Sequence, residues 1–363
     1  MLSLVMIVKN EEHVIERSLD SVLPYVDTWT IVDTGSTDST MEKIRTVAAK
    51  HGKEGVLHER PWVNFGHNRT ELLELARQTE AEGVAWFFMM DADDIFMCEG
   101  TGPSKKPFDQ LFTSSHDAYS LTFKRGSLTY RRPAIFNTKP WVFKGALHEY
   151  AHLDNAVIGI CEGPWVDARV EGARSLNPNK YRDDALALEA EFAGNPDTRT
   201  AFYAAQSWRD SGNVDKSTEW YLRRTTMGGW KQEIYISFLN LVRLTQDIDL
   251  KFKYAWSALE ACPRLEAAQA VLEYLRQRNL WSSRAYHLGL ATATASGITG
   301  TTDNLFSEDM SYKFYDEFSI HAYYTGHDDV AVINGMKAYF AAPLSEQPRI
   351  LNNVKFSAER HKV

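Results

Sequence analysis

The sequence predicts an α/β domain followed by an all-helical domain, and three observations carry this prediction. Strand and helix patterns alternate through about the first 90 residues, apolar and polar residues alternate over about 114–170, and regularly spaced helical segments follow from about residue 172. Alternating strands and helices are typical of a parallel sheet covered by helices. We therefore expect an α/β domain over residues 1–171 and a helical domain over residues 172–363.

The composition is that of an ordinary globular protein. The 363 residues carry 40 Lys and Arg against 48 Asp and Glu, a net charge of −8, and 44% of them are hydrophobic. No apolar run approaches the ~20 residues of a membrane span, and the three cysteines lie too far apart for a Cys-x-x-Cys metal site. We expect a soluble, cytoplasmic protein without a membrane partner. The acidic balance also counts against general nucleic-acid binding.

The first elements follow from apolar runs and periodicity. Leu2–Val8 is a continuous apolar run, typical of a strand buried on both faces, and it lacks the basic leader of a signal peptide. Apolar residues at helical spacing follow Asn10, which we expect to cap that helix. Trp29–Val32 predicts a second strand. The later elements expected here are a helix at about 39–50, a strand at 56–58, a helix at 68–81 and a strand at 84–90.

Three polar clusters follow the predicted strands directly. They are Lys9–Glu12, Asp33–Asp38 and Asp91–Asp94. Ligands of doubly wound sheets bind at the carboxyl ends of the strands, where such clusters meet. A ligand site at this edge of the sheet is therefore predicted from the residues alone.

The predicted secondary structure changes twice in the rest of the chain. From about Ser114 to Val170 an antiparallel pair turning at Arg125-Gly126-Ser127 predicts a mixed extension of the sheet. Beyond it, Pro196, Trp230, Pro263 and Gly297 recur at spacings of 33 or 34 residues. This period is typical of tetratricopeptide-like helical hairpins, whose concave face binds peptides or a partner subunit. We expect a loop over 298–309, and the repeats are compatible with a homodimer.

Several residues in these segments are of types that bind ligands or take part in catalysis, and each also has an alternative, purely structural role. Asp91 and Asp93 alternate onto one side of an extended chain and suit Mg²⁺ or Mn²⁺, although Asp is also common in solvated turns. Asp33, ending a buried strand, can accept a bond from a base or ribose. Arg69 is either a solvated helix residue or a nucleotide contact. The pair His148-Glu149 is either a surface pair or, near a metal, a ligand and a general base.

These residues together resemble family 2 glycosyltransferases, which have the GT-A fold. The matching segments are LSLVMIVKNEEHVIERSLDSVLPYVDTWTIVDTGSTDST and the later DADD. The stretch Gly145–Glu149 resembles the subgroup that joins this domain to tetratricopeptide-like helices. The resemblance covers about residues 1–170 and, more loosely, 172–345. The sequence departs from the family pattern in carrying Asp94 where Glu is common, and in lacking a clear Glu-Asp pair after residue 100.

The resemblance implies roles for individual residues. Asp33 would contact the uracil or ribose of a UDP-sugar, with Asn10 and Glu11 lining the same pocket and Arg69 next to the nucleotide. Asp91, Ala92 and Asp93 would hold the donor, and Asp91, Asp93 and His148 would ligate Mn²⁺ or Mg²⁺. Glu149 and Asp93 would be the catalytic residues, with Glu149 as the base. The resemblance also implies inversion at the transferred sugar.

The leading interpretation is therefore a metal-dependent glycosyltransferase that moves a sugar from a UDP-sugar to a protein or peptide held partly by the helical repeats. A modified nucleic-acid base or an envelope glycan are alternative acceptors, and Lys124, Arg125, Arg131 and Arg132 form a basic patch that suits nucleic acid or donor phosphates. A catalytically inactive repeat scaffold is the alternative from another class. A nucleotidyltransferase would carry a Gly-rich loop where Lys-Asn-Glu-Glu stands.

Overall fold

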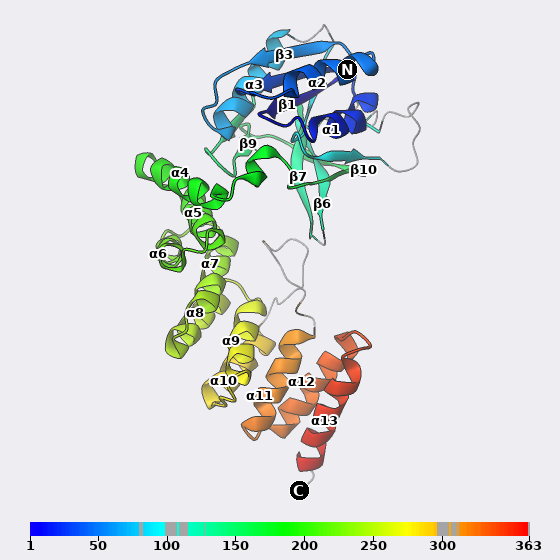
Figure 1. The fold of residues 1–363 in the computed structure, drawn as a ribbon. Coiled ribbons are helices and arrows are strands. Elements are labelled where there is room, and N and C mark those ends of the chain that lie inside the picture. Colours follow the sequence, from blue (N-terminus) through cyan, green and yellow to red (C-terminus); the bar gives the residue numbers. More distant parts are fainter. Residues whose placement is uncertain are drawn as a thin grey trace. The chain divides into compact units, whose positions relative to one another are not determined.

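The computed structural model describes residues 1–79, 83–98, 107, 108, 115–126, 128–295, 305, 310 and 312–361. It divides into two compact units, Met1–Leu188 and Glu189–Val363, which are described separately (Figure 1). The predicted loop over 298–309 lies outside the described residues except for residue 305, and so do Ser114, Ser127 and Gly297.

One mixed sheet of eight strands forms the centre of the N-terminal unit, in the order β3-β2-β1-β4-β7-β6-β10-β5. Its strands are β1 (Leu2–Val8), β2 (Thr28–Asp33), β3 (Gly55–Glu59), β4 (Trp86–Met89), β5 (Ile95–Met97), β6 (Ala118–Arg125), β7 (Leu128–Asn137) and β10 (Ile158–Asp167). The strands β3, β2, β1 and β4 are parallel, whereas β7 runs antiparallel to β4 and β6. The predicted parallel half with an antiparallel extension is confirmed. A separate hairpin joins β8 (Val142–Lys144) and β9 (Tyr150–His152).

Helices cover both faces of this sheet. On one face, α1 (Ile15–Val22) and α2 (Thr40–Lys50) pack on Leu4 and Met6 of β1, and on the other, α3 (Phe65–Thr79) packs on Val5. Successive residues of a strand point to opposite faces, so a strand covered on both sides is apolar throughout. This is why the unbroken apolar run at the start of the chain predicts a central strand.

The prediction that Asn10 caps the first helix is wrong. Asn10 has φ +56°, and the helix begins only at Ile15. The backbone N–H of Asn10 donates to Ser36 Oγ at 2.8 Å, and its side-chain Oδ1 accepts the backbone N–H of Thr37 at 2.7 Å. Asn tolerates the left-handed conformation, and here its side chain joins the loops after β1 and β2.

The first unit extends past residue 171, the predicted end of the α/β domain. The short 3₁₀-helix η3 (Ala173–Leu176) and the helix α4 (Lys180–Gly194) follow, and the division falls after Leu188. Arg174 pairs with Asp184, and its guanidinium lies 4.7 Å from the centroid of the Phe65 ring. These contacts attach the start of α4 to the α/β unit, and only the tertiary structure shows them.

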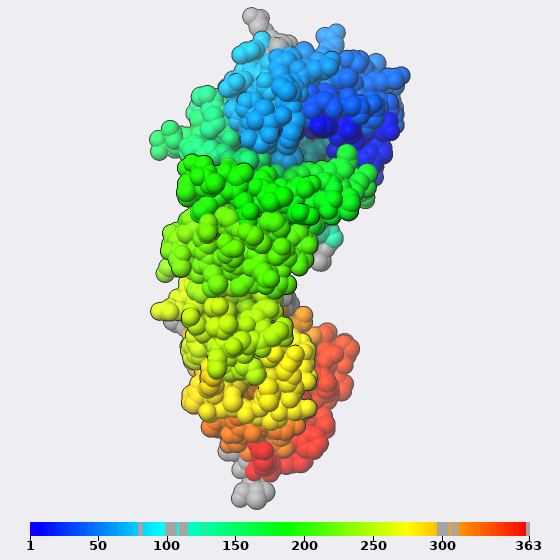
Figure 2. Space-filling view, turned by 60° about the vertical axis from the view of Figure 1, so that its left-hand side comes forward, coloured from blue at the N-terminus to red at the C-terminus, as the bar shows by residue number. Residues whose placement is uncertain are grey.

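The C-terminal unit is helical and follows the predicted repeat. Its remaining helices are α5 (Thr198–Asp210), α6 (Val214–Thr225), α7 (Lys231–Leu244), α8 (Ile248–Ala261), α9 (Glu266–Arg276), α10 (Ser283–Thr294), α11 (Lys313–Tyr324), α12 (Asp328–Ala341) and α13 (Gln347–His361). Within this unit they cover neighbouring parts of the surface in chain order, from green to red (Figure 2). Pro196, Trp230 and Pro263 each precede the first helix of a hairpin, which explains their spacing.

Polar caps define where several of these helices begin. The side chain of Asp197 accepts the backbone N–H groups of Arg199 and Thr200, and Asn213 and Asp247 cap α6 and α8 in the same way. Such caps satisfy N–H groups that have no partner within the helix. Within the described part of the chain, no helix is both long and apolar enough to cross a bilayer.

Candidate active site

Loops that follow three adjacent parallel strands lie along one edge of the sheet. The strands β2, β1 and β4 are neighbours in this order, and Val8 at the end of β1 is in register with Asp33 at the end of β2. The polar clusters after these strands therefore share an edge. The β7 strand, next to β4, adds Arg132 to the same region.

Asp33 presents one carboxylate oxygen that the protein leaves unpaired. Its Oδ1 accepts the backbone N–H groups of Gly35 and Ser36 at 2.9 and 2.8 Å. Gly35 has φ +105°, which glycine adopts without strain. Oδ2 is buried and has no hydrogen-bond partner among the described residues. A buried acceptor without a partner is costly, so this oxygen is suited to accept a hydrogen bond from a ligand.

Asp91 lies between two arginines. Arg69 Nη2 donates to its Oδ1 at 2.6 Å, and Arg132 Nη2 donates to its Oδ2 at 3.0 Å. Burial disfavours the charged form of Asp91, but the two guanidinium groups outweigh this effect and hold the pKa of its carboxyl well below the usual range. Asp91 is therefore ionised, and both of its oxygens are occupied by the protein.

Arg69 also holds Glu149, the residue that the resemblance implies as the base. Arg69 Nε lies 3.0 Å from Glu149 Oε1, and the two side chains are only 9% and 10% exposed. The Arg69 guanidinium lies 5.9 Å from the ring centroids of both Phe65 and Phe143. Glu149, Arg69 and Asp91 thus form a continuous ionic chain in a largely apolar wall.

A close backbone approach places Glu149 beside Arg69. The helix α3 carries Arg69, and its residue Gly66 lies so near the segment before Glu149 that a Cβ there would be 2.4 Å from Gly145 O. Two hydrogen bonds join the same segments, from Phe65 N–H to Ala146 O at 3.1 Å and from Phe143 N–H to Thr70 Oγ1 at 2.8 Å. Only glycine at position 66 permits this approach.

Glu11 and Asp93 face each other across Gly172. The Glu11 carboxylate accepts the backbone N–H of Ala173 at 3.1 Å, and Asp93 Oδ2 accepts those of Glu171 and Gly172, both at 2.9 Å. Burial, with a smaller effect of the Asp93 charge, raises the pKa of Glu11 to about 7. A Cβ at Gly172 would lie 3.1 Å from Glu11 Oε1 and 3.3 Å from Asp93 Oδ2.

The structure separates the basic patch that the sequence groups together. Arg131 pairs with Glu162 and Lys124 lies over the Trp165 ring, whereas Arg132 reaches the carboxylate cluster. Neighbouring residues of a strand point to opposite faces, so Arg131 and Arg132 diverge. The alternation predicts from the sequence that the two arginines diverge, and the strand register decides which of them faces the carboxylates.

Asp94 lies next in the same ionic chain. Arg132 Nη2 is 3.7 Å from Asp94 Oδ2, an oxygen that is buried and makes no hydrogen bond within the described chain. The other oxygen accepts the backbone N–H of Arg169 at 3.1 Å. Burial, together with the charge of Asp91, raises the pKa of Asp94 to about 8. The guanidinium of Arg132 also lies over the Phe123 ring, 4.2 Å from the ring centroid, in a cation–π contact.

The proposed metal ligands do not form a complete coordination site by themselves. They fit better a metal ion that is also coordinated by a bound ligand. No group of three or more His, Cys, Asp or Glu is placed to hold a metal within the described residues. Asp91 is taken by two arginines, and His148 is exposed with φ +54°. Among the described residues, the side-chain hydrogen bonds of Asp93 are all made through Oδ2, which leaves Oδ1 available. Mg²⁺ is commonly bound by one or two carboxylates together with substrate phosphates.

Comparison with protein families identifies the N-terminal part of the chain. Residues 3–114 match the family model Glycosyl transferase family 2. The match includes Asp33, Arg69 and the Asp91–Asp94 cluster. The chain therefore carries a family 2 glycosyltransferase domain in its N-terminal unit, and the resemblance noted in the sequence is confirmed there.

Solved structures resemble the chain only distantly. S. aureus TarS 1–349 in complex with UDP-GlcNAc is 13% identical with a TM-score of 0.37, over 77% of this chain and 92% of that one. Glucosyl-3-phosphoglycerate synthase from Mycobacterium tuberculosis is 23% identical with a TM-score of 0.25, over 34% and 44%. A thermophilic TPR protein of Thermus thermophilus is 14% identical with a TM-score of 0.28, over 48% and 91%. None of the curated proteins compared with the chain matches it.

Proposed function

We propose that the chain transfers a sugar from a UDP-sugar to a protein or peptide, with a divalent metal at the donor diphosphate. The observation that carries this proposal is the family 2 domain, whose strand ends bring Asp33 and the Asp91–Asp94 cluster to one edge of the sheet. The unpaired Oδ2 of Asp33 is suited to the base or ribose of the nucleotide. Asn10, Glu11 and Ala92 border the same edge in this proposal.

The diphosphate is proposed to lie beside Asp93. Asp93 would hold Mn²⁺ or Mg²⁺ jointly with the phosphate oxygens, and His148 is the proposed further contact. The bound ion would stabilise the negative charge that develops on the leaving diphosphate. Arg69 and Arg132 add two positive charges next to Asp91 in the same region.

Glu149 is the proposed general base. Its ion pair with Arg69 suggests a second possible role, in which Glu149 only orients Arg69. A base must accept the proton of the acceptor, whereas a carboxylate that only orients Arg69 would act on the donor through Asp91. The Glu149→Gln variant separates the two roles. If Glu149 is the base, transfer falls by about two orders of magnitude or more while UDP affinity stays near normal. An equal fall in both would assign it to positioning of Arg69.

The test of the proposal is donor hydrolysis and thermal shift across a panel of nucleotide sugars, with and without Mn²⁺. A metal-dependent response to one UDP-sugar supports the proposal and identifies the donor, because a ligand that binds the folded state raises its melting temperature. Asp93→Ala should abolish that response. A folded protein that responds to none of the panel would favour the inactive scaffold, and a response retained in Asp93→Ala would contradict the metal assignment.

The acceptor is the finer part of the proposal. Helical-repeat surfaces suit extended chains, which favours a protein or peptide over an envelope glycan or a modified nucleic-acid base. The separation of Arg131 and Lys124 from Arg132 leaves no continuous basic strip from these residues for nucleic acid.

A further inference from the structure

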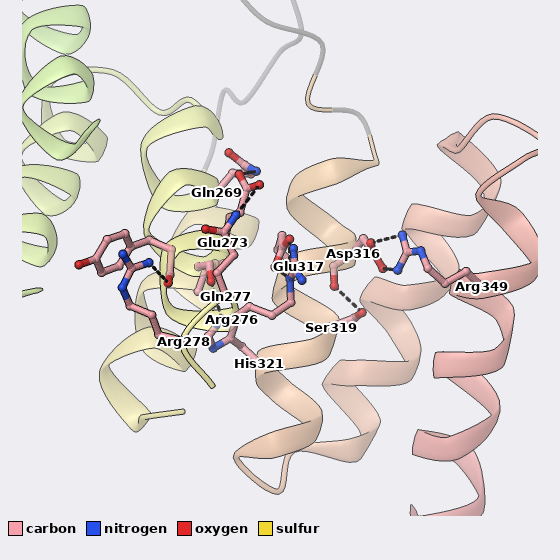
Figure 3. A network of polar contacts seen from close by, with 12 residues as sticks. Gln269, Glu273, Arg276, Gln277, Arg278, Asp316, Glu317, Ser319, His321 and Arg349 are labelled. Atoms are coloured by element: carbon pink, nitrogen blue, oxygen red, sulfur yellow. Dashed lines mark hydrogen bonds and ion pairs between the residues drawn. The ribbon is translucent and has the colours of Figure 1, made fainter. Parts of the chain in front are cut away.

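The helical unit contains a polar groove whose role the donor chemistry does not explain. Its volume is about 730 Å³, and it is lined by residues of α7, α8, α9, α11 and α13 and of the segments just after α9, before α11 and before α13. Figure 3 shows the polar network at its wall, in which side chains of α9 and α11 meet, and Arg349 of α13 reaches Asp316 of α11. All of these residues belong to the C-terminal unit.

Arg276 is anchored at one edge of its guanidinium. Its Nε donates to both oxygens of Glu317, at 2.9 and 2.7 Å. Glu317 is only 9% exposed, whereas Arg276 is 38% exposed. Among the described residues, the side-chain hydrogen bonds of Arg276 are all made by Nε, and Nη1 and Nη2 make none. The buried carboxylate thus holds the arginine in place and leaves its outer N–H groups for a ligand.

The next arginine, Arg349, is more fully paired. Its Nη2 donates to Asp316 Oδ2 at 2.6 Å and to Glu346 Oε2 at 2.9 Å, and its Nε donates to Glu346 Oε2 at 3.0 Å. Asp316 is 9% exposed and Arg349 is 47% exposed. Lys313, on the same helix as Asp316, is exposed and has no acidic partner within the described part of the chain. Cationic groups are therefore exposed to the groove, while two of the carboxylates that balance them lie underneath.

The groove also contains groups that suit a peptide backbone. Gln269 and Gln277 both donate to the carboxylate of Glu273, at 2.9 and 3.4 Å, so amide and carboxylate groups line the wall between the cations. Mixed donors and acceptors can pair with peptide N–H and C=O groups. The carboxylates of Glu273 and Glu346 also line the groove. They disfavour the continuous anionic backbone of a nucleic acid, whereas a peptide can direct single side-chain carboxylates to the cations.

We infer that this groove binds an acidic, extended peptide segment, with a side-chain carboxylate of the segment paired to the outer N–H groups of Arg276. Guanidinium groups present parallel donors that match a carboxylate in a two-bond arrangement, and an arginine already held in place loses little conformational entropy on pairing. Lys313 supplies further positive charge along the segment. The inference rests on the proposed function in that the segment belongs to the protein acceptor.

The test uses the full chain and a fluorescein-labelled peptide of about ten glutamates, with fluorescence anisotropy as the readout. We expect saturable binding that weakens from roughly 50 to roughly 200 mM salt, and about tenfold weaker binding of the matching glutamine peptide. Arg276→Gln should weaken binding of the glutamate peptide about tenfold, and Arg276→Lys by an intermediate factor, because Lys keeps the charge but not the paired donors.

Two further variants separate groove binding from general charge and from misfolding. Arg360→Gln is the matched control, because Arg360 pairs with the largely buried Asp328 as Arg276 pairs with Glu317, is similarly exposed and does not line the groove. It should leave binding unchanged. Lys313→Gln alters an exposed side chain without a buried partner, so it should fold normally and weaken binding about threefold.

Several outcomes would overturn the inference. They are no binding of the glutamate peptide, equal losses in the Arg276→Gln and Arg360→Gln variants, or Arg276-dependent binding of a single-stranded oligonucleotide but not of the peptide. Donor hydrolysis without acceptor is measured on the same variants and should not change in Arg276→Gln. A failure of the proposed function is thus seen as absent hydrolysis in the unsubstituted chain, and a failure of the inference as absent peptide binding.

Discussion

At the scale of single residues, the candidate site depends on a few arginines that connect carboxylates. Arg69 bonds Asp91 and lies against Glu149, and Arg132 connects Asp91 to Asp94. Carboxylates this close would repel one another in a partly apolar environment, and the guanidinium groups offset that repulsion. Asp91 is consequently held in one orientation by the protein alone.

Substitutions of Arg69 and Glu149 should have strongly non-additive effects on the free energy of unfolding. Arg69→Met leaves the nearly buried Glu149 without its partner, so we expect a loss of about 3 kcal/mol in the free energy of unfolding of the N-terminal unit. The double variant with Glu149→Gln should recover about 2 kcal/mol of that loss. Urea denaturation of the two single variants and the double variant measures the coupling, and strictly additive losses would contradict it.

The stability of the chain should fall as pH rises through the range in which Glu11 titrates. The pKa of Glu11 is about 7 in the folded chain and roughly 4 when unfolded, so between these values the folded state binds more protons and the unfolding free energy decreases with pH. Glu11→Gln should flatten this decrease and make the variant more stable than the unsubstituted chain above about pH 7. Unfolding is followed across pH in the presence of a chelator, and parallel curves for the two proteins would refute the assignment.

At the scale of elements, the contact between α3 and the segment before Glu149 decides whether the site forms. Gly66 and Gly145 are the close points, and Gly145 has φ +101°, which other residues rarely adopt. The two hydrogen bonds beside them fix the register of the segment on the helix. Arg69 and Glu149 lie far apart in sequence and come together through this contact.

Gly66→Ala should therefore disturb both stability and transfer. The added methyl group would overlap Gly145 O, so we expect a loss of about 2 kcal/mol and at least about a tenfold fall in transfer as Arg69 and Glu149 separate. Gly194→Ala in α4 is the matched control, because its methyl group would meet nothing within 4 Å, and it should be neutral or slightly stabilising. Thermal unfolding and a transfer assay compare the two, and equal behaviour would contradict the steric argument.

At the scale of the whole molecule, each of the two compact units has a core of its own. Apolar clusters on both faces of the sheet stabilise the first unit, and the second includes a cluster of Ala338, Ala342 and Ile350. Units with separate cores commonly unfold in separate steps. The proposed donor site lies in the first unit and the inferred peptide groove in the second.

Calorimetry of the full chain should accordingly show two transitions. UDP with Mn²⁺ should raise the melting temperature of one transition, and the glutamate peptide should raise that of the other, because each ligand stabilises the unit that binds it. Arg69→Met should lower only the transition that responds to UDP. A single transition that both ligands displace equally would show that the two units unfold together.

The fold could be predicted from the sequence to the extent that local patterns determine it. The run Leu2–Val8 is apolar because both faces of its strand are covered, and the helical hairpins follow a repeat whose start points carry Pro or Trp. Asn10 is the exception. Asn is favoured both as a helix N-cap and in the left-handed conformation of a loop, so its presence after a strand does not tell the two roles apart. Which of Arg131 and Arg132 faces the carboxylates likewise depends on the strand register, which the sequence does not show.

The sequence by itself determined the two-part architecture, the succession of strands and helices, and the polar clusters at the strand ends, because periodicity and chain reversal are local properties. Only the tertiary structure decided that Asp91 is held by Arg69 and Arg132, that Glu149 faces Arg69, and that Arg276 keeps its outer donors exposed in a groove. Those relations join residues distant along the chain, and the packing of whole elements sets the distances between them.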